Sequence, residues 1–324
     1  MTPLLASYRP LSAFSDPAQP TSQLWRTLLG LVAVMLVYIL WLAGLNLFLQ
    51  WRYGRILAAA IREGMFQGQT AGMALLGLFS FAGLLIGTLA VVRLIHRRRA
   101  GTLFGPPARM IRDFRVAAGG VLTLNLVFLI FSIGDDSLRP GQSLGPFLVH
   151  LPFALICLLI QTGAEEVIFR GYLIQQLAAR FRTPAVWMLI PALLFAMGHY
   201  APDLSGNAAP YVVTWAILFG ILAADLTART GTLGAAWGFH FANNAMVMLL
   251  VNSEGSFSGL ALWLAHPGTG WPLALAPCWR KHRVPPRPRW TRAAAACWPP
   301  FWCNAPACAV RGWPPGSRCG AKPP

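Results

Sequence analysis

The sequence predicts an all-α protein, a polytopic transmembrane helix bundle of seven to eight spans. Hydrophobic residues make up 56% of the 324 residues and charged residues only 11%, and the mean hydropathy is +0.55. Several segments also reach the roughly 20 apolar residues that are needed to cross a hydrocarbon layer about 30 Å thick. This composition is typical of integral membrane proteins and excludes an ordinary soluble domain.

Seven segments are predicted to cross the membrane. They are residues 27–50, 70–95, 116–133, 145–180, 184–199, 209–226 and 233–251. If the spans alternate in direction, the arginines near 97–115, 180–182 and 229 lie on one face. The acids Asp135, Asp136, Asp203 and Glu254 lie on the other. This pattern predicts a cytoplasmic N-terminus, although Arg52, Arg55 and Arg62 count against it.

The distribution of charge also bears on the partners of the protein. The net charge of +16 would suggest nucleic-acid binding in a soluble protein. Here nine of the 26 basic residues lie after Pro277, and most of the others lie between predicted spans. Such arginines serve membrane topology. We therefore expect the lipid bilayer as a partner and no nucleic acid.

Composition divides the chain into five parts. We expect a loose or interfacial polar segment at 1–23, N-terminal spans with an arginine-rich cytoplasmic loop at 24–140, a core bearing the polar motifs at 141–256, an incomplete eighth span at 257–277, and a tail at 278–324. The tail is rich in Pro, Arg and Trp and holds five of the six cysteines. A disulfide or metal module and a basic tail on anionic lipid are alternatives. Out-of-frame translation of GC-rich DNA fits this composition best.

Ionisable groups at mid-membrane depth cost roughly 2.5 to 3.5 kcal/mol each on insertion scales, so each needs a partner or a function. Three groups of polar residues lie in separate predicted spans. They are Glu165, Glu166 and Arg170 in AEEVIFR, His199 in FAMGH, and His240 with Asn244 in HFANN. At about 1.5 Å per residue, all three lie roughly 20 Å from the predicted inner boundary. We expect them to meet at one depth.

Helical spacing separates the two adjacent carboxylates. Glu166 and Arg170 are four residues apart and can form an ion pair, whereas Glu165 points about 100° away. His240 and Asn244 are also four apart and share one face. One interpretation is an ion cluster that only stabilises the bundle. The other leaves Glu165 free for chemistry, directed at His199 across the bundle.

The chemistry of this set allows two arrangements. A carboxylate and an imidazole can polarise a water molecule, while a second imidazole and an amide can donate to a developing oxyanion. Alternatively, Glu165, His199 and His240 could bind a zinc ion with one open position. No HExxH sequence and no evident serine or cysteine nucleophile accompany them.

These residues resemble the CAAX prenyl protease and bacteriocin-processing (CPBP, or Abi) family of intramembrane proteases. The family motifs EExxxR, FxxxH and HxxxN are matched by Glu165 to Arg170, Phe195 to His199, and His240 to Asn244. The resemblance covers about residues 145–252. It implies that Glu165 and His199 activate the hydrolytic water, that His240 and Asn244 form the oxyanion site, and that Glu166 and Arg170 support them.

The resemblance implies an intramembrane endopeptidase that acts on a membrane-associated peptide or protein. The family has been described both as metalloproteases, with zinc as the metal expected here, and as glutamate-type proteases. The expected location is the inner (cytoplasmic) membrane of a bacterium. The alternative is a non-catalytic membrane protein, such as a bacteriocin immunity or scaffold protein, that uses the same polar cluster. A third hypothesis is a transporter whose carboxylates relay protons, but the spans show no internal repeat that would favour it.

Overall fold

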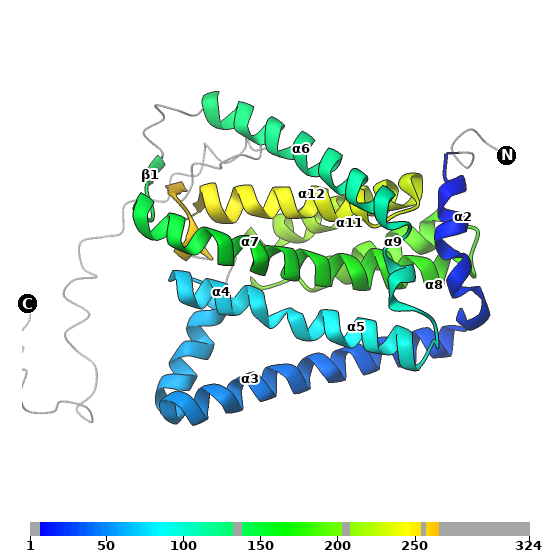
Figure 1. The fold of residues 1–324 in the computed structure, drawn as a ribbon, viewed down its shortest axis with the longest axis horizontal. Coiled ribbons are helices and arrows are strands. Elements are labelled where there is room, and N and C mark those ends of the chain that lie inside the picture. Colours follow the sequence, from blue (N-terminus) through cyan, green and yellow to red (C-terminus); the bar gives the residue numbers. More distant parts are fainter. Residues whose placement is uncertain (1–6, 132–137, 203–207, 254–256, 266–324) are drawn as a thin grey trace, which may run out of the picture. The chain divides into compact units, whose positions relative to one another are not determined.

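The structure is a computed structural model and describes residues 7–131, 138–202, 208–253 and 257–265 (Figure 1). These residues belong to one compact unit, Met1–Ala276. The predicted tail lies outside the described residues, as do Asp135, Asp136, Asp203 and Glu254. The origin of the tail therefore stays a prediction.

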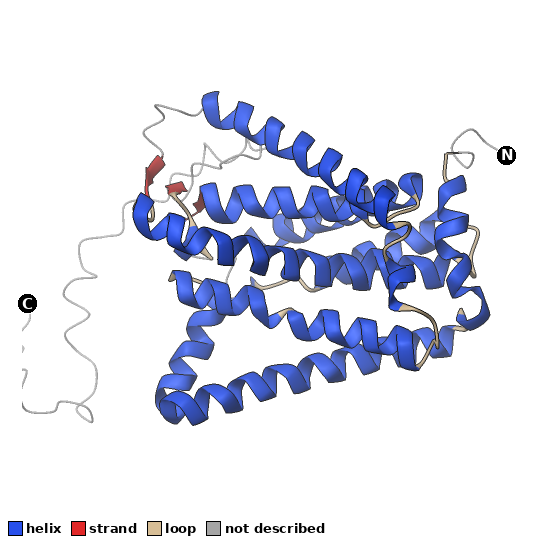
Figure 2. Ribbon diagram, viewed as in Figure 1, coloured by secondary structure: helices blue, strands red, loops and turns tan. Residues whose placement is uncertain are grey.

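Helices make up nearly all of the described chain, which confirms the all-α class (Figure 2). Within the described residues, five helical segments are long and apolar enough to cross a membrane. They are Leu24–Gln67, Ala71–Leu94, Ala100–Ile130, Leu144–Ala178 and Ala209–Thr230. Pro184–Met197 is apolar but shorter, and the seventh predicted span corresponds to a helical stretch from Gly234 to Leu250. The count of seven to eight spans stays a prediction.

The first long helix, α3 (Leu24–Gln67), continues well beyond the predicted span because it is two helical segments joined at a kink. Gly54 has φ 77° and ψ 165° there, a conformation that only glycine adopts readily. Across the kink, Arg62 Nη1 donates a hydrogen bond to Asn46 Oδ1 at 2.9 Å. Trp51, just before the kink, is 80% exposed, as expected of an interfacial anchor.

The N-terminal segment is folded rather than loose. Residues 9–21 form α2 (Arg9–Ser15) and the 3-10 helix η1 (Asp16–Thr21). Leu11 and Phe14 of α2 are buried in a cluster with Leu177. Burial of these apolar side chains helps to hold the segment against the bundle.

The remaining helices follow in chain order. They are α4 (Ala71–Ser80), α5 (Ala82–Leu94), η2 (Ala100–Leu103), α6 (Pro107–Phe131), α7 (Leu144–Glu166), the π-helical η3 (Val167–Leu173), α8 (Ile174–Ala178), α9 (Pro184–Met197), α11 (Ala209–Thr230), α12 (Gly234–Ala245) and the π-helical η5 (Met246–Leu250). Figure 1 shows α7 beside α12, with α5 on its other side, and both neighbours contact it. The core of the bundle therefore surrounds α7.

Small residues let α12 approach α6 closely. A Cβ atom on Gly234 would collide with the carbonyl oxygen of Met110, and one on Gly238 with that of Phe114. The two glycines are four residues apart and form a GxxxG pattern, which is common where membrane helices pack. The position of α12, and of His240 on it, therefore depends on these glycines.

A small sheet lies at the end of the bundle where α7 begins (Figure 2). Its strands are β1 (Leu138–Pro140), β2 (Val251–Ser253) and β3 (Trp263–Ala265), in the order β1-β3-β2, with β1 antiparallel and β2 parallel to β3. The 3-10 helix η6 (Ser258–Leu260) precedes β3. Residues 257–265 of the predicted eighth span are therefore not a membrane helix, because they form a short 3-10 helix followed by a strand. Residues 266–277 lie outside the described chain.

Candidate active site

The first polar motif lies where α7 changes from an α-helix to a π-helix. Glu165 and Glu166 are the last residues of α7, and Arg170 lies inside η3. These side chains are 7%, 0% and 1% exposed. Short π-helical stretches inside α-helices are frequent at functional sites. The sequence analysis assumed a regular α-helix and missed this change.

The predicted ion pair is present and is completely buried. Arg170 Nη1 donates to Glu166 Oε1 at 2.9 Å. The guanidinium carbon lies 4.6 Å from the centre of the Phe195 ring, and Nη2 is 3.5 Å from the carbonyl oxygen of Gly220. The carboxylate, the aromatic face and the carbonyl together compensate the buried positive charge.

His240 of α12 contacts the same carboxylate oxygen. Its Nδ1 lies 2.8 Å from Glu166 Oε1. An ionised carboxylate only accepts hydrogen bonds, so Nδ1 carries the proton and donates it. The other ring nitrogen, Nε2, lies 3.6 Å from Glu165 Oε2 and 3.3 Å from Asn244 Nδ2. Glu166 thus orients the ring so that Nε2 faces Glu165.

Asn244 lies one turn beyond His240 and has a second partner. Its Nδ2 donates to Gln161 Oε1 on α7 at 3.0 Å. Gln161 is four residues before Glu165 and shares its helix face, which is the signal by which the sequence could have indicated it. The sequence analysis did not include this residue. The amide of Asn244 is therefore held between α7 and His240.

His199 follows the end of α9 and is half-buried. Its Nδ1 donates to the carbonyl oxygen of Phe195 at 2.9 Å, and the two rings lie 4.4 Å apart. Because Nδ1 carries the proton, Nε2 remains an acceptor. His240 lies beside Glu165, with 3.6 Å between Nε2 and Oε2, and the predicted pairing of Glu165 with His199 stays a prediction.

A cavity of about 150 Å³ joins the second and third motifs. Its walls are formed by Phe195, His199, Val212, Trp215, Ala216, Phe219, His240, Asn243 and Asn244. The Phe219 ring lies 4.9 Å from the His240 ring. The cavity is thus apolar except for two imidazoles and two amides, the kind of surface that binds a small apolar ligand through a few polar contacts.

The zinc site predicted from Glu165, His199 and His240 stays a prediction. Glu165 lies beside His240, and His199 donates from Nδ1 to the Phe195 carbonyl oxygen, which leaves its Nε2 available as a ligand atom. Across the part of the chain that the structure describes, no three His, Cys, Asp or Glu side chains converge as metal binding requires. We therefore derive no chemical step through a metal.

Comparison with known proteins agrees with the motifs. Residues 147–246 match the family described as type II CAAX prenyl endopeptidase Rce1-like. The chain is also 28% identical over 179 residues to the uncharacterized protein YyaK of Bacillus subtilis. The aligned residues make up 53% of this chain and 59% of YyaK. No solved structure matches. Together with the apolar helices, the family match supports an integral membrane protein, and the match over residues 147–246 agrees with the CPBP family that the three motifs predict.

Proposed function

We propose that the protein is an intramembrane endopeptidase that hydrolyses a peptide bond in a membrane-associated peptide or protein. The observation that carries this proposal is the carboxylate of Glu165. Its Oε2 atom is buried, has no hydrogen-bond partner among the described residues and lies 3.6 Å from His240 Nε2. Glu166 Oε2 is also buried without a partner, but the Oε1 of Glu166 accepts from Arg170 and His240, whereas no described side chain donates to Glu165. A carboxylate with a buried oxygen and no donor is costly, which favours a catalytic function for Glu165 over a purely structural one.

Glu165 is assigned as the general base. Its free oxygen accepts a proton from a water molecule, whose oxygen attacks the carbonyl carbon of the scissile bond. His199 is assigned as the second partner of this water, because its Nε2 remains an acceptor. When the tetrahedral intermediate collapses, the proton passes to the amine nitrogen and the C–N bond breaks.

His240 and Asn244 are assigned to the oxyanion. A proton on His240 Nε2 turns the ring into a donor, and the Glu166 carboxylate stabilises the resulting imidazolium. The amide of Asn244, held by Gln161, supplies a second donor. Glu166 and Arg170 are positioning residues, since both are buried behind His240 and contact it or each other.

The test is peptide cleavage by the purified protein in liposomes. The substrates are a farnesylated peptide ending in a CAAX sequence and a set of unmodified apolar peptides, with products identified by mass spectrometry. We expect Glu165→Gln and His199→Ala to lower kcat/KM by about 10²- to 10⁴-fold, the range of a lost general base.

Glu63→Gln is the matched control, because Glu63 is an exposed carboxylate of α3 outside the polar cluster. It should cleave at the wild-type rate. Unchanged cleavage by both cluster variants would contradict the assigned roles. If no peptide is cleaved and the cluster variants lose only stability or partner binding, the non-catalytic immunity or scaffold alternative is favoured. We also propose a bacterial cytoplasmic membrane as the location, because the relative YyaK is bacterial.

A further inference from the structure

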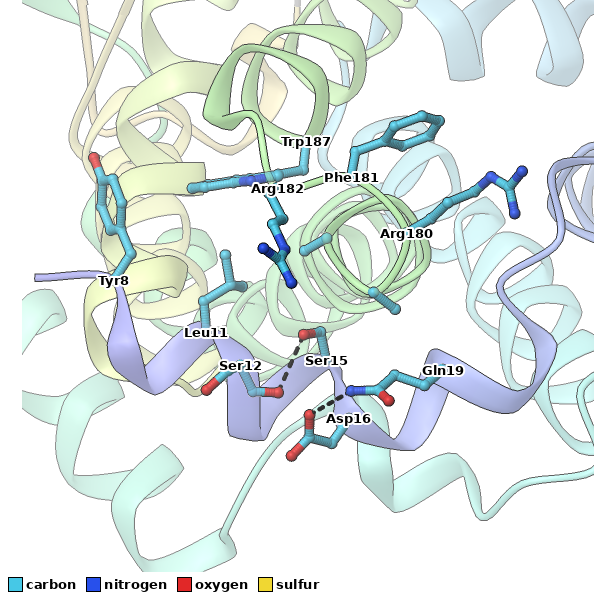
Figure 3. A pocket seen from close by; sticks show the side chains of 12 residues that line it. Tyr8, Leu11, Ser12, Ser15, Asp16, Gln19, Arg180, Phe181, Arg182 and Trp187 are labelled. Carbon is cyan, nitrogen blue, oxygen red and sulfur yellow. Dashed lines mark hydrogen bonds between the residues drawn. The ribbon is translucent and has the colours of Figure 1, made fainter. Parts of the chain in front are cut away.

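A second and larger cavity lies at the arginine-rich end of the bundle, away from the polar cluster. It has a volume of about 790 Å³ and is bounded on one side by α2 and η1 and on the other by the end of α8 and the turn into α9 (Figure 3). Fourteen residues separate Glu166 from Arg180, or roughly 20 Å of helix. The cavity is therefore separate from the proposed catalytic site.

Two arginines line this cavity, and neither has a carboxylate partner. In the described chain, Arg180 and Arg182 form no ion pair, in contrast to Arg112 with Asp113 and Arg229 with Asp225. Figure 3 shows Arg182 reaching across the pocket toward Ser15 of α2, while Arg180 extends to one side of it. Both side chains are exposed, so both are available to an anion.

The other polar groups of the wall are already engaged. Tyr8 donates to Asp225 Oδ1 at 2.7 Å, and Ser15 donates to the carbonyl oxygen of Ser12 at 3.1 Å. Asp16, the acid in the wall, accepts a hydrogen bond from Gln19 at 2.8 Å. The groups of the wall that remain free to bind a ligand are thus mainly the guanidinium groups of Arg180 and Arg182. Asp16 adds one negative charge to the wall.

The rest of the wall is apolar and continues toward the membrane. Leu11, Ala178, Phe181 and Trp187 line the cavity. Farther along α9, the apolar side chains at positions 189, 190 and 193 are 42%, 42% and 49% exposed. A ligand with an anionic head in the cavity could therefore place its hydrocarbon chains along α9.

We propose that this cavity binds the phosphodiester headgroup of an anionic phospholipid from the leaflet on the arginine-rich side. Guanidinium groups bind phosphate with strong, charge-assisted hydrogen bonds, and arginines next to membrane spans attract anionic lipid. The apolar wall and the exposed face of α9 favour a lipid over free phosphate. This proposal does not depend on the peptidase function.

The test measures lipid binding by native mass spectrometry of the detergent-purified protein. Dioleoyl phosphatidylglycerol, dioleoyl phosphatidylcholine and inorganic phosphate are titrated separately. We expect phosphatidylglycerol to bind more tightly than phosphatidylcholine. Arg180→Gln/Arg182→Gln should weaken phosphatidylglycerol binding about 30-fold and each single variant about fivefold, as expected for roughly 1 kcal/mol per arginine.

Arg52→Gln/Arg55→Gln is the matched control. It removes the same charge from two exposed arginines of α3 at the opposite end of the bundle, and it should bind phosphatidylglycerol as the wild type does. Thermal unfolding in phosphatidylcholine should be unchanged in all variants. Equal binding of both lipids, or equal loss in the control, would overturn the proposal. Tighter binding of inorganic phosphate than of lipid would overturn the lipid assignment.

Discussion

Arg170 is the buried charge around which the polar cluster is built. It pairs with Glu166, and Glu166 in turn holds His240. Removing one member of a buried ion pair leaves the other charge uncompensated, which typically costs about 3 to 5 kcal/mol. The pair therefore has a structural effect that is separable from any effect on catalysis.

We expect Arg170→Gln to lower the free energy of unfolding by about 3 to 5 kcal/mol. The double variant Glu166→Gln/Arg170→Gln should lose less, because no unpaired charge remains. The measurement is reversible unfolding in mixed micelles. Arg182→Gln serves as the control and should leave stability unchanged, since Arg182 is exposed and has no described carboxylate partner. A double variant as unstable as the single one would contradict this explanation.

His96 belongs to a second buried hydrogen-bond network, which links α5 to η3 and α8. Its Nε2 lies 2.9 Å from the Tyr172 hydroxyl, which donates to the carbonyl oxygen of Thr27 at 3.2 Å. Its Nδ1 lies 2.7 Å from Gln176 Nε2 and 3.0 Å from the Thr21 hydroxyl. In this arrangement Nδ1 accepts and Nε2 donates, so the ring is neutral.

Acid should weaken this network. Burial, with a smaller contribution from the positive charge of Arg98, lowers the pKa of His96 from 6.5 to about 4. Because the folded pKa lies below the unfolded one, protons bind the unfolded chain first, and stability falls as pH drops from about 6.5 to about 4. We expect the melting temperature of the wild type to fall more steeply over this interval than that of His96→Gln. Parallel curves for the two proteins would rule out this linkage.

At the scale of elements, two helix features determine where the side chains of the polar cluster lie. The change to η3 after Glu166 alters the direction in which the following side chains point. The glycines of α12 set its distance from α6. His240 lies two residues beyond Gly238, so the second feature acts directly on the site.

Gly238→Ala should destabilise the protein by about 1 to 3 kcal/mol, the usual cost of overpacking a filled interface. The added methyl group meets the Phe114 carbonyl oxygen and would force α6 and α12 apart. Thermal unfolding checks the loss. Gly44→Ala is the control within α3, because nothing lies near its Cβ position and alanine favours a helix. Equal stability of both variants would show that the close approach is not required.

At the scale of the whole molecule, the arginine-rich loops gather at one end of the bundle. The N-terminal helix α2 packs on α8 and α11 near Arg180 and Arg229, so the N-terminus and the arginine-rich loops share one end. The sheet and the kink of α3 lie at the other end (Figure 1). Arginine-rich ends face the cytoplasm in most membrane proteins.

This topology predicts opposite labelling of two cysteines in a variant whose native cysteines are replaced by serine. Gly72 and Gly101 are exposed and have open space at Cβ. Gly72 lies in the first turn of the candidate span Ala71–Leu94, and Gly101 lies beyond its other end. In intact cells, a membrane-impermeant maleimide should label Gly72→Cys, and it should label Gly101→Cys only after permeabilisation. The reverse result would place the arginine-rich end outside.

The sequence by itself determined the features that depend on composition and on spacing within one helix. Hydropathy determined the membrane class, and the four-residue spacing determined the Glu166–Arg170 pair. Both follow from local physics, namely the transfer of apolar residues into lipid and the regular rise of a helix. The three family motifs could also be recognised from the sequence, because each is defined by residue spacing within one short segment.

Only the tertiary structure decided which side chains meet across helices. Glu166 and His240 are 74 residues apart in the sequence, and His240 also lies beside Glu165. The π-helical turn, the kink at Gly54 and the strand at Trp263–Ala265 departed from the expected helices. The contacts between helices and the departures from regular helix depend on how distant segments pack and satisfy their backbone hydrogen bonds. Residue spacing along a single helix carries no information about packing between distant segments.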